Sequence, residues 1–273
     1  MKIALVPPYK PVGSKYQMTN EGPLAINEVI ELVTKRGQME GVELDIADAY
    51  PIENPLEERD EIFLAEITPG FLRKIKEYSE MGKYDAIITN GSIEPGFFAA
   101  REISKIPIAS GPHSAMYMAS LIADRFSVLE LTDAMAQIVR HYAQTWGISH
   151  KLVSIRNIGV SSIYMMRLLH KYKNKEERLR ALEVKEVIDS SIIQCTAAIE
   201  KDRANAIILG CIPLQTYWDV FRQRLDQKGY QEIPLIMGVS AALEMAKAMV
   251  NLKLMPSKRA YPSDNLERQP AFR

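Results

Sequence analysis

One cysteine stands where a protein would place a reactive thiol. Cys211 follows the apolar run from Ala206 to Leu209, which is typical of a buried strand, and it precedes Pro213, which suits the first turn of a helix. Free N–H groups at the start of a helix lower a thiol pKa from about 8.5 toward neutrality. Such a thiolate could act as a general base at carbon, and the thiol as a general acid. Alternatively, Cys211 is a small buried hydrophobic residue, a common environment for free cysteine.

The other cysteine and the four histidines do not indicate a metal site. Cys195 shares the apolar stripe of a helical segment with Ile188 and Ile192, which predicts a position in the core. The histidines lack metal-ligand spacing, and no Cys-x-x-Cys pair occurs. Glycine-rich nucleotide loops and the Gly-x-Ser-x-Gly turn of serine hydrolases are also missing from the sequence. We therefore expect chemistry that uses no metal and no cofactor.

Two further titratable residues could exchange protons with a substrate. Glu130 lies near the end of the apolar run from Phe126 to Leu131, and His113 follows Ser110 at the end of another strand. Glu130 could replace a missing acid–base group or disfavour a substrate carboxylate nearby. The alternatives are a solvated acid at a strand end and a histidine of the surface or the core.

Other residues at the ends of predicted strands could bind the substrate. The backbone and hydroxyl groups of residues 90–92 could hold an oxyanion. The loop from Tyr9 to Pro23 could close over the site, or it could be an ordinary solvated loop. The residues expected to contact the substrate are Pro8, Asn90, Gly91, Ser92, Ser110 and Ile212.

Short β-branched runs alternate with helical patterns along the chain. Helical periodicity is predicted over residues 62–78 and 176–201, and Asp133 is the expected N-cap of a helix that ends at Trp146. Pro95 is expected in the first turn of another helix. This β-α-β-α order predicts a parallel sheet with helices on both faces.

The two halves of the sequence resemble each other. Residues 85–91 match residues 205–211, and residues 106–111 match residues 233–238. We therefore predict an α/β fold of two pseudo-symmetric parallel-sheet halves, residues 1–124 and 125–253, followed by an extended tail over residues 254–273. The active site is expected in the crevice between the halves, at the carboxyl ends of the strands, where Gly91 and Cys211 take equivalent places.

Composition excludes several other classes of protein. The 273 residues include 34 Lys and Arg and 34 Asp and Glu, so the formal net charge is zero, which argues against nucleic-acid or anionic-membrane binding. No apolar run approaches the roughly 18 residues of a membrane span. Two cysteines and a start that does not look like a signal peptide predict a cytoplasmic protein with free thiols. A small molecule is the expected partner.

Several motifs together resemble one family. The segment from Ile207 to Cys211 resembles the second-cysteine motif of the aspartate/glutamate/hydantoin racemase superfamily. The segments Glu94-Pro95-Gly96, Ala99 to Glu102, Arg125 to Val128 and Ser257 to Tyr261 are similar to the hydantoin racemase branch. The resemblance implies two α/β halves with the active site between them, no cofactor, and at least a homodimer.

The sequence departs from this family at one catalytic position. The resemblance implies two cysteines on opposite faces of the substrate, one removing a proton and the other supplying one, but the first-cysteine position falls on Gly91. Of the two cysteines that the resemblance implies, this sequence has only the second, Cys211. Arylmalonate decarboxylases have the same glycine and cysteine arrangement, and their first strand also ends similarly to Val6-Pro7-Pro8.

Three functions follow from this departure. The first is a racemase or isomerase that forms an enolate at an acidic carbon next to a carbonyl, with Cys211 handling the proton and Glu130, His113 or water as its partner. The second is a decarboxylase of a malonate-type substrate, for which one thiol suffices. The third is a non-catalytic protein that binds a small molecule in the crevice.

Overall fold

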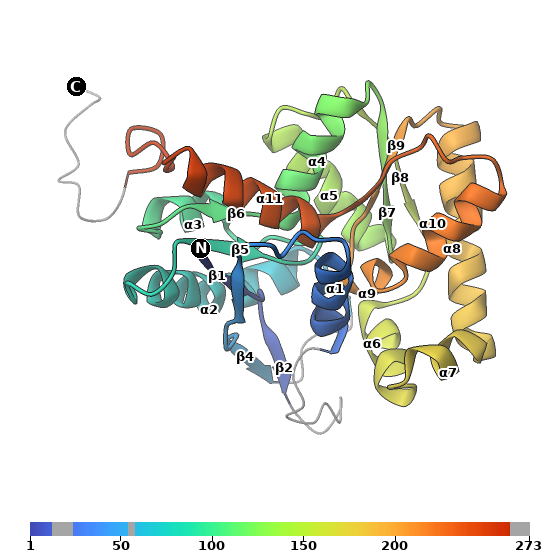
Figure 1. Cartoon of the computed structure of the whole chain (residues 1–273), viewed down its shortest axis with the longest axis horizontal. Helices are drawn as coiled ribbons and strands as arrows, with labels where there is room; N and C mark the ends of the chain where they lie inside the picture. The colour runs from blue at the N-terminus through green and yellow to red at the C-terminus, as the bar shows by residue number, and fades with distance from the viewer. Residues whose placement is uncertain (13–23, 54–57, 263–273) are drawn as a thin grey trace.

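The fold consists of two α/β halves side by side, as Figure 1 shows for a computed structural model of the chain, which describes residues 1–12, 24–53 and 58–262. Each half contains a four-stranded sheet, ordered β3-β1-β5-β6 in the first half and β8-β7-β9-β10 in the second. All the pairings are parallel. The predicted fold of two pseudo-symmetric parallel halves is therefore confirmed. The strands of the two sheets are β1 (Lys2–Val6), β3 (Glu43–Ile46), β5 (Ala86–Thr89), β6 (Ile108–Ala109), β7 (Phe126–Glu130), β8 (Leu152–Asn157), β9 (Ala206–Leu209) and β10 (Leu235–Met237).

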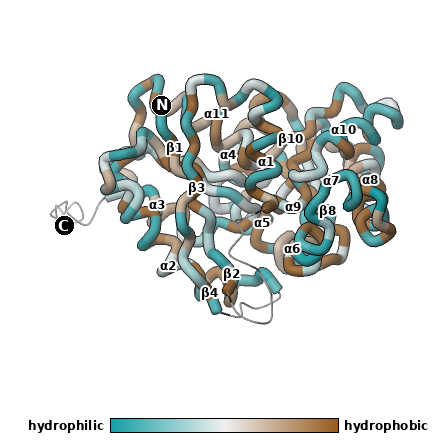
Figure 2. Tube along the Cα trace, turned by 60° about the horizontal axis from the view of Figure 1, so that its bottom comes forward, coloured by the Kyte–Doolittle hydropathy of each residue, from teal (hydrophilic) through white to brown (hydrophobic). Residues whose placement is uncertain are grey.

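The central strands are buried on both faces because helices cover both sides of each sheet. Every residue of β5 and β9 is buried, in keeping with their runs of apolar residues. The outer helices alternate between hydrophilic and hydrophobic residues, as the tube in Figure 2 shows for α8 (Leu182–Glu200) and α10 (Trp218–Gln227). Four further helices are α2 (Glu61–Glu80), α3 (Phe97–Ile103), α5 (Asp133–Thr145) and α7 (Lys175–Arg180).

Two helices cross between the halves. Helix α4 (Gly111–Ile122) follows the last strand of the first sheet but packs on β9 and β10 of the second. Helix α11 (Gly238–Asn251) follows the second sheet and packs on β5 and β6 of the first. Their first residues meet so closely that a Cβ on Gly111 would lie 3.6 Å from the carbonyl carbon of Gly238. Each half therefore supplies a helix to the other.

Smaller elements border the crevice. Helix α1 (Leu24–Lys35) of the first half contacts α6 (Ser162–Lys171) and α9 (Ile212–Gln215) of the second. Strands β2 (Lys10–Val12) and β4 (Pro51–Glu53) form a separate parallel pair. The helix α9 at the centre begins directly after Cys211, so the crevice closes around the predicted thiol.

Several local predictions differ from the structure. The helix predicted over residues 176–201 is two helices, because Ala181 adopts an extended backbone (ψ 138°) between α7 and α8. Pro95 precedes its helix, since Gly96 is the N-cap with a left-handed φ of 63°. Thr132, not Asp133, is the N-cap of α5, and its side chain accepts a hydrogen bond from the Met135 N–H.

The first residues after α11 contact the first half of the chain. The Lys258 Nζ donates to the Ser104 carbonyl, and the Arg101 guanidinium donates to the Tyr261 hydroxyl. The rest of the predicted tail, residues 263–273, and the predicted loop after residue 12 lie outside the described residues. The division of the chain at residues 124/125 and 253/254 stays a prediction. Within the described residues, no helix is both long and apolar enough to cross a membrane.

Candidate active site

Cys211 stands between a buried strand and the first turn of a helix, as its neighbours predict. It is the N-cap residue of α9 with φ −70° and ψ 142°, and Pro213 lies in the first turn. The residue is 9% exposed. Cys211 is therefore a buried residue at the carboxyl end of β9.

The pKa of the Cys211 thiol is raised, which is the opposite of the shift expected from the sequence. Burial is the main cause, and the charge of the nearby Glu130 carboxylate adds to it. The Arg59 guanidinium, the Ile212 N–H and the Ser92 hydroxyl lower the pKa but do not overcome burial. The cost of burying a thiolate is therefore larger than the stabilisation from the helix start, and the free protein holds a neutral thiol.

Glu130 is a fully buried acid beside this thiol. Burial raises its pKa from 4.5 to about 8, and the Ser92 hydroxyl and the Leu131 N–H offset only part of the rise. The Ser92 hydroxyl and the Leu131 N–H lie near the carboxyl group, but among the described residues neither of its oxygens receives a hydrogen bond of good geometry. The carboxyl group is therefore mostly protonated at neutral pH, and it can donate a hydrogen bond.

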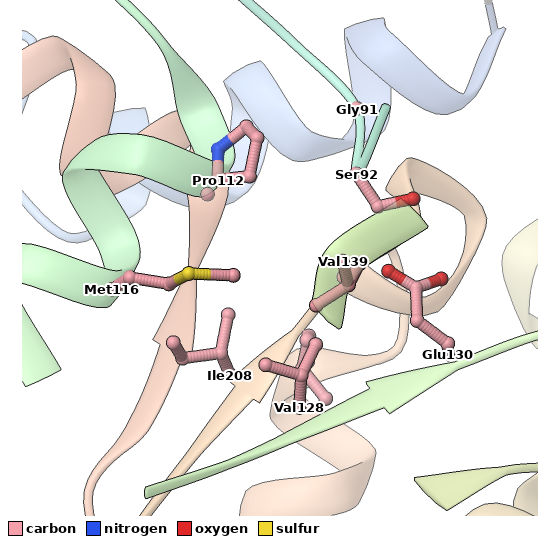
Figure 3. Close-up of a pocket in the computed structure, with 11 residues that line it drawn as sticks. Gly91, Ser92, Pro112, Met116, Val128, Glu130, Val139 and Ile208 are labelled. Atoms are coloured by element: carbon pink, nitrogen blue, oxygen red, sulfur yellow. The ribbon is translucent and has the colours of Figure 1, made fainter. Parts of the chain in front are cut away.

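Strand register explains why Glu130 reaches the thiol. Leu129 of β7 pairs with Leu209 of β9, so Glu130 lies level with Gly210. A Cβ at position 210 would be 1.9 Å from the Glu130 Oε1, so only glycine leaves room for the carboxyl group. In Figure 3 the side chains of Glu130 and Ser92 point toward each other across a small cavity. The cavity, about 10 Å³, is lined by Gly91, Ser92, Pro112, Met116, Val128, Glu130, Val139, Ile208, Leu209, Gly210 and Gly238.

The loop after β5 forms the opposite wall with several unsatisfied polar groups. Asn90, Ser92 and Glu94 are buried, and each has one side-chain oxygen without a hydrogen-bond partner among the described residues. Leaving such a group unpaired costs about 1–3 kcal/mol. Their concentration beside Cys211 and Glu130 marks the surface that a polar ligand would satisfy.

Gly91 has a backbone that differs from that of Cys211. Its φ is 110°, a left-handed value that a side chain rarely adopts, although a Cβ would meet no atom closer than 3.6 Å. The corresponding φ of Cys211 is −70°. The first half therefore presents backbone at this point, in a conformation suited to glycine and not to a second cysteine.

Glu94 anchors this loop. The Thr89 hydroxyl donates to its carboxylate, and burial raises its pKa from 4.5 to about 7 against the opposing effects of Ser110 and the Gly111 N–H. The Tyr142 hydroxyl of α5 bonds both backbone groups of Glu94, accepting from the N–H at 2.8 Å and donating to the carbonyl at 2.9 Å. The second half therefore fixes the loop that carries Gly91.

Tyr9 and Arg59 were not identified as site residues from the sequence, but the structure brings them together near Cys211. Arg59 is 3% exposed, and its Nε donates to the Tyr9 hydroxyl at 3.0 Å. The pKa of Tyr9 is raised by burial and by the proximity of Cys211, and it is lowered by Arg59. Only the position of Tyr9 in the predicted loop, directly after Pro8, was a sequence signal for this pair.

His113 does not join these groups. Its ring packs against Phe97, Tyr117 and Trp146, and its Nε2 lies 3.2 Å from an Arg101 nitrogen. Burial and the Arg101 charge lower its pKa to about 3, so the imidazole is neutral. The structure therefore gives His113 a packing environment away from the small cavity.

The remaining predicted contacts lie at the ends of the expected elements. Pro8 follows β1 and is buried, and Ile212 opens α9. Ser110 is the N-cap of α4, where its hydroxyl accepts from the His113 N–H at 3.2 Å. Among the described residues, no group of three or more His, Cys, Asp or Glu could hold a metal ion.

Comparison with known proteins decides the family. The model of the Asp/Glu/hydantoin racemase family matches residues 27–246, which is most of the chain. The chain belongs to the Asp/Glu/hydantoin racemase family. The hydantoin racemase of Pseudomonas sp. (strain NS671) is 27% identical over 190 residues, covering 70% of this chain and 68% of that protein. The hydantoin racemase of Rhizobium meliloti is 27% identical over 197 residues, covering 71% and 73%.

Solved structures of the family share the fold. The allantoin racemase from Pseudomonas fluorescens superposes with a TM-score of 0.73 at 20% identity, covering 97% of both chains. The allantoin racemase from Klebsiella pneumoniae gives a TM-score of 0.71 at 22% identity, covering 96% of this chain and 93% of that one. The two-half architecture is thus the racemase-family fold.

Proposed function

We propose that this protein is a cofactor-independent racemase or isomerase that acts at an acidic carbon next to a carbonyl, with Cys211 as a proton-transfer group. The proposal rests chiefly on one observation: a fully buried, unpaired carboxyl group, Glu130, lies beside Cys211. The family membership and the hydantoin racemase relatives support the same class of reaction. Hydantoins, amino acids and related carboxylates are the candidate substrates.

The reaction begins with transfer of the substrate α-proton to the Cys211 thiolate, which leaves an enolate and a thiol. The thiolate is a minor form in the free protein because burial raises its pKa. The neutral Glu130 carboxyl donates a hydrogen bond to the enolate oxygen, and the Ser92 hydroxyl can donate a second. Returning a proton to the opposite face of the carbon inverts the stereocentre.

The ionisation of Glu130 limits this reaction at high pH. Above its pKa of about 8 the carboxylate loses the proton that it would donate, and its charge raises the pKa of Cys211 further. We therefore expect activity to fall as the pH rises above about 8. Once ionised, the same group would also repel a substrate carboxylate nearby, so the loss of activity above pH 8 should be larger for a carboxylate substrate than for the neutral ring of a hydantoin.

A decarboxylase is the second candidate, and Gly91 is the observation that favours it. A malonate-type substrate forms its enolate by losing carbon dioxide, so no group is needed to remove a proton. The Cys211 thiol then protonates one face, which agrees with a neutral thiol in the free protein. The backbone of Gly91 leaves the opposite face without a side chain.

Proton NMR in deuterium oxide tests the proposal directly. The protein would be incubated with a panel of hydantoins, amino acids and substituted malonates, together with Cys211→Ala, Glu130→Gln and, as a matched control, Cys195→Ala, which removes a buried thiol from α8. Deuterium uptake at the stereocentre with loss of optical rotation is the expected result, and the loss of optical rotation should be abolished only by the first two variants.

The other outcomes distinguish the alternatives. Release of carbon dioxide with deuterium on one face would identify the decarboxylase. Loss of optical rotation that persists in Cys211→Ala would contradict the assignment of the thiol. No exchange with any compound would favour a binding protein.

A further inference from the structure

A racemase of this architecture needs a second proton-transfer group that Cys211 and Glu130 do not supply. Inversion requires one group on each face of the substrate carbon. Both residues come from neighbouring strands of the second half, β9 and β7. The first half presents only the backbone of Gly91 at the position equivalent to the thiol.

Building on the proposed function, we infer that Tyr9 is the second acid–base group, facing the substrate from the first half, and that Arg59 positions it. Tyr9 follows the end of β1, and β1 pairs directly with β5, the strand that leads to Gly91. The tyrosine therefore extends from the strand next to the vacant first-cysteine position. Strand β1 has the same place in the first sheet as β7 has in the second. Tyr9 therefore corresponds to the residues that follow β7.

The Tyr9 ring packs against the apolar cluster that contains Cys211. Its ring packs edge-on against Phe63, with 5.1 Å between ring centroids, at the margin of the apolar cluster that contains Cys211. The two groups are close enough for a thiolate at Cys211 to raise the pKa of Tyr9. The Ser162 hydroxyl, in the first turn of α6, lowers that pKa. Tyr9 thus contacts groups of both halves.

Arg59 supplies the positive charge that this chemistry needs. Besides its hydrogen bond to Tyr9, its guanidinium carbon lies 4.2 Å from the Phe63 ring centroid and 5.2 Å from that of Tyr9. It lowers the pKa of both Tyr9 and Cys211. Because a guanidinium stays protonated, it stabilises a single negative charge on either the phenolate or the thiolate.

The proton transfers balance in both directions. In one direction the Cys211 thiolate removes the α-proton, and the Tyr9 hydroxyl gives its proton to the opposite face, leaving a thiol and a phenolate. The reverse reaction starts from that thiol and phenolate and restores the thiolate and the hydroxyl. The pair holds one proton before and after each turnover and two while the enolate exists, so the site carries a single negative charge throughout, and the neutral Glu130 adds no second one.

Exchange measured separately on each enantiomer tests this assignment. Each enantiomer of the best-exchanged hydantoin of the panel would be incubated in deuterium oxide with wild type, Tyr9→Phe and Cys211→Ala. The control is Tyr217→Phe, because Tyr217 is also buried in this apolar cluster and lies beside an arginine, Arg178, with 5.6 Å between the guanidinium and its ring. Phenylalanine keeps the aromatic packing and removes only the hydroxyl.

The two variants should have complementary defects. Tyr9→Phe should exchange one enantiomer with retention, lose exchange of the other at least 100-fold, and fail to racemise either. Cys211→Ala should show the reverse preference, while Tyr217→Phe stays within about twofold of wild type. Racemisation by Tyr9→Phe near the wild-type rate, or an equal loss with both enantiomers, would overturn the inference while the racemase proposal stands. No exchange by wild type would overturn both.

A substrate-free measurement tests the role of Arg59. The rate of Cys211 alkylation by iodoacetamide would be followed against pH in wild type, Arg59→Gln and Arg59→Lys. The profile should move to higher pH in Arg59→Gln, because the cation that favours the thiolate is lost, and Arg59→Lys should restore part of the shift. An unchanged profile in Arg59→Gln would contradict the positioning role.

Discussion

Replacing Glu130 with glutamine should make the protein more stable at neutral pH. The carboxyl group titrates at about 8 in the folded chain, above its ordinary value of 4.5. A raised carboxyl pKa means that the folded state binds the proton more tightly than the unfolded state does. Its contribution to stability is fully present below pH 4.5 and is lost as the pH rises toward 8. Glutamine keeps the shape of the side chain and removes the titration.

The magnitude follows from the two pKa values. At pH 7 the unfolded chain gains about 3 kcal/mol from ionising this residue that the folded chain cannot gain. Between pH 5 and pH 8 the free energy of unfolding of wild type should fall, relative to that of Glu130→Gln, by about 1 kcal/mol for each pH unit. The difference in free energy of unfolding is large because Glu130 is fully buried and no positively charged group lowers its pKa.

Urea unfolding followed by circular dichroism at pH 5, 6, 7 and 8 measures this difference. The exposed Glu186 of α8 provides the control variant Glu186→Gln, which removes one carboxylate without opening the site. The free energies of unfolding of wild type and Glu130→Gln should diverge as the pH rises. A constant difference across the four pH values would refute the buried, protonated state of Glu130.

The remaining predictions concern the cysteine and the two glycines of the site. Alkylation of Cys211 should still be accelerating at pH 9, and Cys195, with a pKa of about 12, should stay unmodified in the native protein; a plateau below pH 8 would contradict the buried thiol. Gly91→Cys should lower the free energy of unfolding by about 1–2 kcal/mol because of its φ of 110° and should not raise the racemisation rate, which urea unfolding and polarimetry would check. Gly210→Ala should reduce the rate at least tenfold, since its Cβ would occupy the place of the Glu130 carboxyl, and an unchanged rate would mean that this carboxyl group is dispensable.

The sequence was sufficient for the fold because its strands are short, apolar and repeated. The runs that form β5 and β9 match in sequence and occupy equivalent positions in the two sheets. The predicted helix boundaries were less accurate where a single backbone angle determines where a helix begins or ends. The extended Ala181 separates α7 from α8, and the left-handed Gly96 moves the start of α3 past Pro95. Neither angle is visible in an apolar pattern.

The site was only partly predictable. The sequence singled out Cys211 and Glu130 because they end strands, and their catalytic roles stay predictions. The direction of the thiol pKa shift could not be predicted, because it depends on burial by groups that are far away in sequence. Arg59 was missed because it lies in a charged stretch where a solvated side chain is the ordinary expectation, and only the folded chain brings it to Tyr9. His113 was considered because histidine often transfers protons, but its aromatic neighbours explain it as a packing residue.

The crossing of α4 and α11 has a consequence for the origin of the duplicated chain. A single ancestral unit with this connectivity would leave one face of its sheet only partly covered, because its last helix packs on a neighbour's sheet. Two such units would cover each other by exchanging that helix, as in a domain-swapped dimer. Joining two copies end to end would preserve the arrangement and then allow the copies to diverge, one keeping the thiol and the other losing it. On this view, separately expressed halves should be insoluble alone and should recover the fold when refolded together.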